Sequence, residues 1–148
     1  MACRLFNIVM EQELNHLYVD KSSIPSAGSG LFTSKRIEKG ELIIEYTGEI
    51  NTWDEVRHDA DNLYIYFVND NYVINAKDHS EAIARYANDA HGLNRMPDLH
   101  NNSRFVNIHG KIFIKATKLI QPGSEIFVDY GKAYWETVKK NKELSNKK

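Results

Sequence analysis

Residues 117–131, TKLIQPGSEIFVDYG, contain the pattern on which the fold assignment depends. Pro122 and Gly123 form a turn signal, and the apolar run Ile126–Tyr130 that follows is typical of a short strand. The start of this stretch repeats an earlier one, SKRIEKGELI at 34–43, with a hydroxyl residue, Lys, Ile, Gly and Ile at matching positions. Two copies are too few for a solenoid, which needs at least about three repeats. The sequence therefore predicts one strand–turn–strand unit used twice, with both copies packed in the same core.

The remainder of the chain reads as further short strands separated by turns. His109-Gly110 predicts a hairpin turn, and Lys39-Gly40 predicts another turn. Many short strands with little helix indicate a mostly β fold assembled from several small sheets. The segments rich in β-branched and aromatic residues are Leu17–Val19, Leu31–Thr33, Leu42–Tyr46, Leu63–Val68, Tyr72–Ile74, Arg104–Ile108 and Lys111–Ala116.

Helix signals are few and short. Thr52 and Glu55 have the spacing of a capping box and predict a helix that runs to about Ala60. Ser80 is expected to cap one further turn. The stretch Ala133–Leu144 is rich in helix formers and predicts a C-terminal helix.

Composition limits the class of protein. The chain has 148 residues, of which 42% are hydrophobic and 26% charged, which suits one soluble domain with its own core. The net charge of -1 gives no electrostatic footprint for nucleic acid, so no direct nucleic-acid binding is predicted. The lysines from Lys139 to Lys148 are interpreted as a solvated tail. We find neither a signal peptide nor an apolar run of the ~20 residues that a membrane span requires, and expect a soluble intracellular protein without membrane association.

Metal binding is not predicted. Cys3 is the one cysteine, which excludes an internal disulfide and a cysteine-rich zinc cluster within these residues. The six histidines are scattered along the chain, and none is assigned as a metal ligand.

Four short motifs follow one another along the chain. Ser26–Phe32 places two glycines around a serine just before a strand, which lets the backbone turn and lets a ligand approach it closely. It is followed by EYTGE at 45–49, ARYAND at 84–89 and EIFVDYG at 125–131. Each motif alone is compatible with an ordinary strand end or turn. It is the order and spacing of the four motifs along the chain that distinguish this sequence from one with unrelated turns and strand ends.

In this order the motifs resemble the SET domain family of lysine methyltransferases, over about residues 18–135. The family begins with Gly-x-Gly-Leu-Phe and continues through a basic-Ile-x-x-Gly segment to Tyr-x-Gly-Glu. Its central segments read Ile-Asp-Ala and Arg-Phe-Ile-Asn-His-Ser, and it closes with Pro-Gly-x-Glu-Leu-x-x-Asp-Tyr. The matching stretches here are Gly28–Phe32, Arg36–Glu49, Ile74–Ala76, Arg85–Ala90 and Pro122–Tyr130.

The chain departs from the family pattern at the central motif. Asp89 and Ala90 stand where the family usually has His and Ser, and the Cys-x-Pro-Asn that usually follows is absent. Asn101 or Asn102 is expected to supply the asparagine of that missing segment. The family's His contributes mainly backbone contacts to the cofactor, so Asp89 bears on the geometry and affinity of the site and need not abolish binding.

The resemblance implies a fold, an activity and a location. The fold is a mostly β SET domain of the β-clip type, with few short helices, that forms a single domain over residues 1–148 with a C-terminal helix and tail at 133–148. The activity is transfer of a methyl group from S-adenosylmethionine to a lysine of a protein, with a histone tail as one candidate substrate. A histone substrate would make the protein nuclear or chromatin-associated.

The same resemblance implies site residues. Tyr130 matches the active-site tyrosine and Tyr46 a tyrosine of the lysine channel, with Phe127, Val128 and Tyr134 as expected neighbours. Without the family match these aromatics would be read as ordinary core. Glu125 and Asp129 are interpreted as buried structural residues. The expected cofactor contacts are Gly28, Ser29, Gly30, Tyr64, Arg85, Asn88, Asp89, Tyr134 and Trp135, the last being equally compatible with a cap on the core.

Two alternatives remain open at the level of sequence. Replacement of His-Ser by Asp89-Ala90 is compatible with a SET-like module that binds a lysine peptide without modifying it, which cofactor binding would distinguish. A small β domain without a ligand would not require the motifs at 85–88 and 125–130. The acidic residues between Asp54 and Asp70 either attract a basic peptide or form a solvated surface, and we prefer the second reading. The specific lysine, the number of methyl groups and the oligomeric state are not encoded in a readable form.

Overall fold

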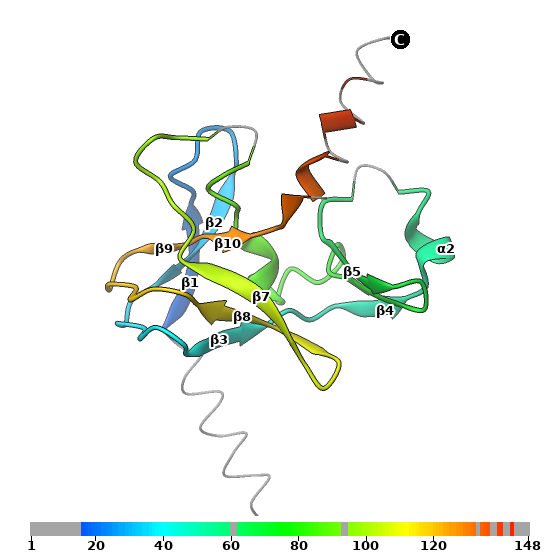
Figure 1. The fold of residues 1–148 in the computed structure, drawn as a ribbon, viewed down its shortest axis with the longest axis horizontal. Coiled ribbons are helices and arrows are strands. Elements are labelled where there is room, and N and C mark those ends of the chain that lie inside the picture. Colours follow the sequence, from blue (N-terminus) through cyan, green and yellow to red (C-terminus); the bar gives the residue numbers. More distant parts are fainter. Residues whose placement is uncertain are drawn as a thin grey trace, which may run out of the picture.

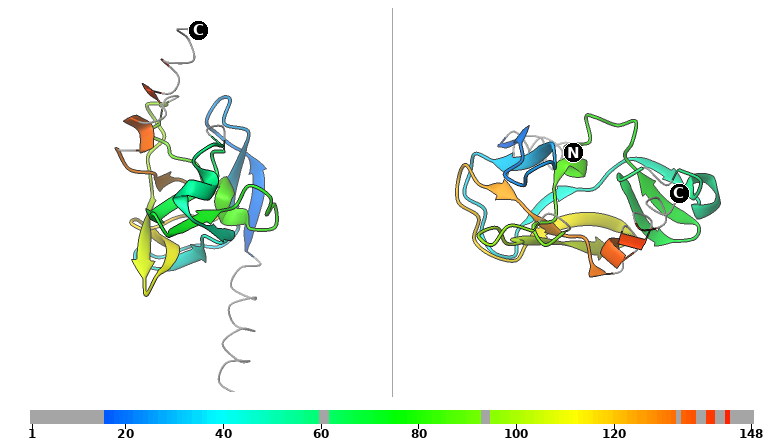
Figure 2. Two further views of the ribbon diagram at one scale, coloured as in Figure 1. Left: turned by 90° about the vertical axis from the view of Figure 1, so that its right-hand side faces the viewer. Right: turned by 90° about the horizontal axis from the view of Figure 1, so that it is seen from above.

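The computed structural model describes residues 16–59, 62–92, 95–132, 134–136, 139–140 and 143. They form three small sheets with few helical residues, namely two short helices and a helical segment after residue 131, as the mostly β prediction requires. Figure 1 shows one three-stranded sheet at the left, the other with α2 at the right, and the four-stranded sheet between and below them. Figure 1 shows the helical residues after 131, drawn in orange and red, leading upward away from the sheets, and Figure 2 gives two further views. Within the described residues no helix is long and apolar enough to cross a membrane.

The strand order in the sheets joins segments that are far apart in sequence. The first sheet has the order β1-β2-β9, the second β10-β7-β8-β3 and the third β4-β6-β5. All pairs are antiparallel except β10 with β7. The elements are β1 (Leu17–Lys21), β2 (Ser29–Thr33), β3 (Leu42–Glu45), β4 (Glu49–Asn51), α2 (Trp53–Val56), β5 (Ile65–Asn69), β6 (Tyr72–Asn75), the 3-10 helix η1 (Ile83–Tyr86), β7 (Ser103–Ile108), β8 (Lys111–Ala116), β9 (Glu125–Ile126) and β10 (Val128–Asp129).

The repeated strand–turn–strand unit is present, and its two copies pair with each other. Ile37 and Ile120, which occupy equivalent positions, exchange both backbone hydrogen bonds at 2.9 Å. On either side of this pair, equivalent bonds recur with the copies exchanged. In the first pair, Gly40 N–H donates to Ala116 C=O (2.8 Å), and the equivalent Gly123 N–H donates to Thr33 C=O (2.7 Å). In the second pair, Ala116 N–H donates to Glu41 C=O (2.9 Å), and the equivalent Thr33 N–H donates to Ser124 C=O (3.1 Å). The two copies are therefore related by an approximate local two-fold axis.

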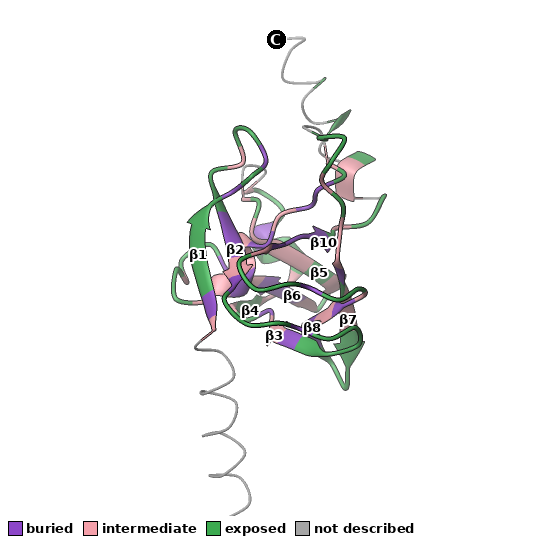
Figure 3. Ribbon diagram, turned by 90° about the vertical axis from the view of Figure 1, so that its left-hand side faces the viewer, coloured by how far each residue is buried: buried purple, intermediate pink, exposed green. Residues whose placement is uncertain are grey.

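The core lies where these two copies meet the four-stranded sheet. Ile114 and Ile126 are 0% exposed, and Ile37 and Ile120 are 2% exposed. Figure 3 shows β2 buried behind the exposed β1, whereas the tip of the β7–β8 hairpin is exposed. The hairpin turn at His109 and Gly110 has positive φ at both residues, 52° and 86°, as a two-residue turn of this kind requires. The sequence-based hairpin assignment is thus confirmed.

Several boundaries differ from the predictions. The capping box of Thr52 and Glu55 is present, but α2 ends at Val56 and not near Ala60. Ser80 caps no helix, because η1 begins at Ile83 and has no side-chain cap. The predicted strand Ile126–Tyr130 is two strands of two residues, since the peptide between them pairs with a different segment, and β4 was not predicted at all.

The predicted C-terminal helix falls largely outside the described residues. Of that stretch, residues 134–136, 139–140 and 143 have helical backbone, as does Lys132 just before it. The remaining positions between Ala133 and Leu144 lie outside the described residues.

Replacing Ile114 with Ala is expected to lower the free energy of unfolding by about 2–5 kcal/mol, because a cavity remains in a fully buried site. Ile108, which is 38% exposed on the neighbouring strand, provides a matched control, and its replacement with Ala is expected to cost less than about 1 kcal/mol. Urea unfolding of the two variants measures the difference. Equal losses would show that the core does not centre on β8.

Candidate functional site

The candidate site is built around the peptide groups of Phe127, which lies between β9 and β10, and of Val128, the first residue of β10. The C=O of Phe127 accepts hydrogen bonds from the backbone N–H of Asn102 (3.0 Å) and Ser103 (3.1 Å), and its N–H donates to Asn102 Oδ1 (3.0 Å). On the other side, the N–H of Val128 donates to the C=O of Asn88 (2.8 Å). Three segments distant in sequence therefore meet at one point, and this point positions the pockets beside it.

An aromatic cavity of about 50 Å³, which we call the narrow pocket, lies next to this meeting point. Tyr130 stacks on Phe105 with ring centroids 6.3 Å apart and meets Tyr134 edge-on at 4.9 Å. The Tyr130 hydroxyl donates to the C=O of Ala87. The lining residues are Tyr46, Leu63, Ile65, Tyr66, Arg85, Ala87, Phe105, Tyr130 and Tyr134.

Burial changes the acid–base behaviour of the tyrosines in the narrow pocket. Desolvation, reinforced by the neighbouring Tyr134, raises the pKa of Tyr46 and of Tyr130 far above the ordinary value of about 10. Desolvation also raises the pKa of Tyr66 and of Tyr134. The hydroxyls are therefore neutral at physiological pH and act as hydrogen-bonding groups, not as bases.

A second cavity of about 430 Å³, which we call the wide pocket, adjoins the narrow one. This volume lies within the range of about 300–1,000 Å³ that is common for small-molecule sites. Leu63, Arg85, Tyr130 and Tyr134 line both cavities, so the two adjoin at these residues, Tyr130 among them. The other lining residues of the wide pocket are Ile24, Ser26, Ala27, Gly28, Ser29, Tyr64, Tyr86, Asn88, Asp89, Gly92 and Trp135.

Arg85 provides a fixed cation at the junction of the two pockets. Its guanidinium carbon lies 4.4 Å from the ring centroid of Tyr64 and 4.7 Å from that of Tyr86. One terminal nitrogen donates to the C=O groups of Lys77 (2.7 Å) and Ala76 (2.9 Å). Its Nε is buried and has no hydrogen-bond partner among the described residues. A buried unpaired donor beside a cavity suits a ligand that brings an acceptor.

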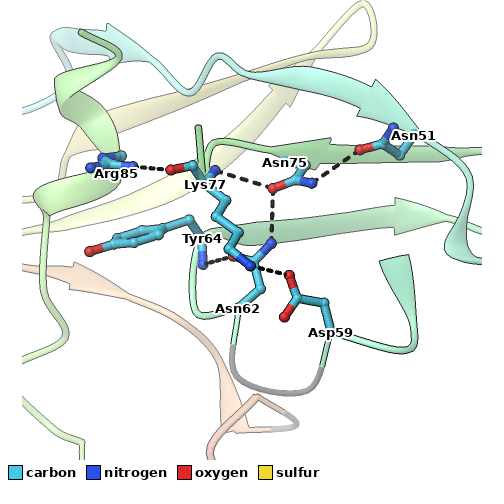
Figure 4. A network of polar contacts seen from close by, with 7 residues as sticks. All are labelled: Asn51, Asp59, Asn62, Tyr64, Asn75, Lys77 and Arg85. Atoms are coloured by element: carbon cyan, nitrogen blue, oxygen red, sulfur yellow. Dashed lines mark hydrogen bonds and ion pairs between the residues drawn. The ribbon is translucent and has the colours of Figure 1, made fainter. Parts of the chain in front are cut away.

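A chain of amides holds Tyr64 beside Arg85 (Figure 4). Asn75 Oδ1 accepts from Asn62 Nδ2 at 2.9 Å, and Asn75 Nδ2 donates to Asn51 Oδ1 at 3.2 Å. Asn62 Oδ1 in turn accepts from the backbone N–H of Tyr64 at 2.9 Å. The network ties the segment before β5 to β4 and β6, which fixes this wall of the wide pocket.

The glycine-containing turn forms the opposite wall. Gly28 has φ +73°, and Ser26, which is not a glycine, has φ +65°, so both lie in the left-handed region. The turn is closed by a hydrogen bond from Ser22 N–H to Gly28 C=O at 2.8 Å. Asn88 Nδ2 donates to the C=O of Ser29 at 2.9 Å and connects the turn to the central motif. Gly28 and Ser29 thus line the wide pocket with constrained backbone.

Gly30 has a structural position, in contrast to the sequence-based expectation of a cofactor contact. It does not line the wide pocket, and a Cβ there would lie 2.5 Å from Glu125 Oε2. Glu125 is 5% exposed and accepts from Ser22 Oγ and Ser23 N–H, both at 2.7 Å. Gly30 is therefore needed for the close approach of β2 to a buried carboxylate, and the expectation that Glu125 is buried is confirmed.

Comparison with known proteins agrees with the resemblance read from the motifs. The family model for the SET domain matches residues 28–131, which is most of the chain. The chain belongs to the SET domain family. A curated relative of this SET domain is the histone-lysine N-methyltransferase EZH2 of Chaetomium thermophilum, 33% identical over 133 residues. A solved structure of ctPRC2 in complex with H3K27me3 and H3K27M is similar with a TM-score of 0.63 at 28% sequence identity.

The relatives are much longer than this SET domain. The match to the curated relative covers 81% of this chain and 8% of that protein, and the structural match covers 78% of this chain and 14% of that one. What these longer proteins bind or modify is therefore not transferred with the fold.

The structure brings together almost all residues that the resemblance assigned to this SET domain's site. Tyr46 and Tyr130 both line the narrow pocket. All of the expected cofactor contacts except Gly30 line the wide pocket; they are Gly28, Ser29, Tyr64, Arg85, Asn88, Asp89, Tyr134 and Trp135. Within the described part of the chain, no three His, Cys, Asp or Glu side chains are grouped as metal ligands would be.

Two expected neighbours of the lysine channel lie elsewhere. Phe127 packs in a separate small cluster with Ile24 and Ala90, and Val128 is 0% exposed in the main core. Neither residue lines the narrow pocket. Asp129 was expected to be buried, but it is exposed and its Oδ1 accepts from Gly131 N–H at 2.8 Å.

Sequence reasoning missed two aromatic walls of the narrow pocket, Tyr66 and Phe105. Their rings meet at 4.8 Å, and each also contacts Tyr46, at 6.0 and 5.8 Å. A signal was present, since Tyr66 is two residues from Tyr64 on a predicted strand and so points to the same face. No comparable signal identified Phe105, because the pairing of β7 with β10 depends on distant sequence.

Replacing Tyr46 with Phe is expected to flatten the alkaline decline in stability. Because the folded pKa is raised, Tyr46 keeps its proton in the folded chain at a pH where the unfolded chain loses it. Its stabilising contribution is complete below about pH 10 and is lost as pH rises toward the folded pKa, with a slope of up to about 1.4 kcal/mol per pH unit. Urea unfolding between pH 9 and 11 measures both slopes, and parallel slopes would show that the Tyr46 hydroxyl is not desolvated.

Proposed function

We propose that this SET domain is an S-adenosylmethionine-dependent protein-lysine N-methyltransferase. The observation that carries the proposal is the meeting of a wide pocket and a narrow aromatic pocket at Tyr130. Methyl transfer between two molecules needs two separate entrances that converge on one point, with the reacting atoms held in line. Family membership supports the same reaction.

The residues of the wide pocket fit S-adenosylmethionine. The unpaired Arg85 Nε suits a ligand with a carboxylate, the constrained backbone at Gly28 permits close approach, and the Trp135 ring suits stacking on a purine. When bound, the cofactor supplies a methyl group on a positively charged sulfur. The Tyr130 and Tyr134 rings, which line the wide pocket, would offer an electron-rich surface to that charge.

The narrow pocket prepares a lysine for attack. A free lysine amine has a pKa of about 10.4 and is almost fully protonated at neutral pH. The aromatic walls that raise the tyrosine pKa values disfavour the ammonium form, and so favour the neutral amine. The Tyr130 hydroxyl donates to Ala87 C=O, which leaves its oxygen lone pairs to accept from an amine N–H and so orient the nitrogen.

The reaction needs no base among these tyrosines. The amine loses its proton to solvent before it enters, because Tyr46 and Tyr130 are neutral and hold their own protons. With S-adenosylmethionine held by the wide pocket, the amine nitrogen would bond to the methyl carbon as the carbon–sulfur bond breaks, which would leave a neutral thioether and a positively charged methylated amine. The chain's contribution is positioning, exclusion of water and electrostatic preorganisation.

We propose a histone tail as the protein substrate on the basis of the EZH2 relative, and with it a nuclear or chromatin-associated location. The acidic residues near α2 do not add support. Asp59 pairs with Lys77 at 2.7 Å, Asp54 with Arg57 at 3.6 Å, and Glu55 serves the capping box. Asp61, in the same tract, lies outside the described residues.

We also propose that residues 1–148 form one SET domain, with the catalytic part within about residues 18–135. The family model ends at residue 131, whereas the wide pocket extends to Trp135. The segment after the last motif is therefore counted as part of the same functional unit.

A peptide-binding module without activity is the second candidate, because Asp89 and Ala90 replace the family's His-Ser. The aromatic walls of the narrow pocket around Tyr130 would then hold a lysine without a methyl donor. Titration of the purified chain with S-adenosylmethionine separates the two candidates, since the module need not bind it.

Replacing Tyr130 with Phe is expected to reduce methyl transfer by about 10²–10³-fold, the usual effect of losing one positioned hydroxyl in a preorganised site. Purified protein is incubated with methyl-labelled S-adenosylmethionine, core histones and an array of lysine-containing peptides, and label on lysine is counted.

Tyr18→Phe is the matched control, because Tyr18 is exposed on β1 and lines neither pocket. Transfer by the parent chain and by Tyr18→Phe, with little by Tyr130→Phe, supports the proposal. Cofactor binding without transfer would show that the array lacks the substrate and would exclude a histone-tail substrate, whereas absence of cofactor binding would favour the inactive module. Full activity of Tyr130→Phe would exclude Tyr130 as the active-site residue.

A further inference from the structure

The carboxylate of Asp89, at the position where the sequence departs from the family pattern, is buried and fully engaged. It is 6% exposed and accepts four hydrogen bonds. Oδ1 accepts from His91 N–H and from Asn101 Nδ2, both at 2.8 Å. Oδ2 accepts from Tyr130 N–H at 3.0 Å and from Trp135 Nε1 at 2.6 Å. A carboxylate accepts at both oxygens and donates at neither, so it suits a site that presents four N–H donors.

Two of these donors belong to the walls of the wide pocket. Tyr130 N–H belongs to the residue where the two pockets meet, and the Trp135 indole is part of the wide pocket itself. Asp89 therefore joins the central motif to the chain after the closing motif through a single carboxylate oxygen. A shift of that oxygen would move both walls.

The Trp135 ring is held on three sides. Its face stacks on the Tyr130 ring with centroids 5.8 Å apart and planes 13° apart. Its outer edge lies so close to Gly92 that a Cβ there would be 2.4 Å from the ring. Its N–H points at Asp89. Stacking and edge contact are compatible with sliding of the ring, whereas the hydrogen bond fixes one orientation.

Asn101 completes the arrangement on the other side of Asp89. Its Nδ2 donates to Asp89 Oδ1, and its Oδ1 accepts from the N–H of Ala90 at 2.8 Å. Ala90 is 1% exposed and packs with Ile24 and Phe127, so the loop that carries Asp89 is anchored by both a polar and an apolar contact. The carboxylate is thus a fixed acceptor, and the orientation of the indole depends on its hydrogen bond to that acceptor.

We propose that Asp89 is a positioning residue that holds the Trp135 indole as a wall of the cofactor site, so that the two residues act as a coupled pair. The proposal rests on the proposed function for the identity of the ligand. It explains the departure from the family pattern, since a carboxylate in place of His supplies the acceptor that the indole N–H requires when it is buried.

The test is a double-mutant cycle on the full chain, with the dissociation constant for S-adenosylmethionine measured by calorimetry. Asp89→Asn places an amide donor against N–H donors, and Trp135→Phe keeps an aromatic ring but removes the indole N–H. Each single variant is expected to weaken binding about tenfold, equivalent to about 1.4 kcal/mol, and the double variant to be no weaker than the weaker single variant.

Controls are matched in chemistry. Asp20→Asn changes an exposed carboxylate that also accepts from a backbone N–H, and Trp53→Phe changes the other tryptophan, 40% exposed on α2. Both are expected to leave the dissociation constant unchanged. Circular dichroism and thermal unfolding confirm that each variant is folded.

A fluorescence measurement tests the pair without any ligand. In a Trp53→Phe background Trp135 is the single tryptophan, since the chain has two. Adding Asp89→Asn is expected to shift its emission to longer wavelength, because the released ring meets water. If the parent chain binds no cofactor, the proposed function fails, and the emission shift still decides whether Asp89 holds Trp135.

Two outcomes would overturn the inference. One is an unchanged Trp135 emission in the Asp89→Asn variant, which would show that the carboxylate does not orient the ring. The other is additivity of the two single effects on binding, which would show that the residues act independently. If Asp89→Asn does not fold, Trp135→Phe alone decides, because unchanged cofactor affinity would exclude a role for the indole N–H.

Discussion

The peptide group between Phe127 and Val128 is the constraint on which the rest of the structure depends. β9 and β10 contain two residues each, too few for a ladder to hold them. Their place is fixed instead by hydrogen bonds to two asparagines. The backbone N–H of Asn102 donates to the C=O of Phe127, and its side-chain oxygen accepts from the N–H of Phe127. The C=O of Asn88 accepts from the N–H of Val128. A buried peptide group left unpaired costs about 1–3 kcal/mol, so each of these contacts is required. Both pockets lie beside this point because the chain leaves it directly into Tyr130.

The paired copies of the strand–turn–strand unit explain why this point is rigid. The second copy leads into β9, and its turn is bonded to the first copy through Ile37 and Ile120. The repeat, the hairpin at His109-Gly110 and the strand Lys111–Ala116 were all readable from sequence, since each rests on local pattern. β4 and the break at Phe127 were not, because their partners are distant in sequence and no local pattern specifies a partner.

The residues of the candidate site likewise fall into those that could be predicted from sequence motifs and those that could not. Tyr130, Tyr46 and Arg85 were identified through ordered motifs, and the structure places them together. Gly30 was assigned to the ligand, yet its lack of a side chain serves Glu125, since a glycine in sequence does not reveal which neighbour needs the space. The partners of Asp89 were also unpredictable, because Trp135 is 46 positions away and the motif pattern assigns that position a different residue.

One physical cause links the tyrosines to the proposed chemistry. Low solvation in the narrow pocket makes any charged form costly, which raises the pKa of Tyr46 and Tyr130 and would lower that of a lysine amine placed among them. The shifts have opposite signs because the charged form of tyrosine is the deprotonated one and that of lysine the protonated one. The same walls therefore keep the tyrosines from acting as bases and make a base unnecessary. A more polar pocket would lose both properties together, so the aromatic character of the site matters as much as the single hydroxyl of Tyr130.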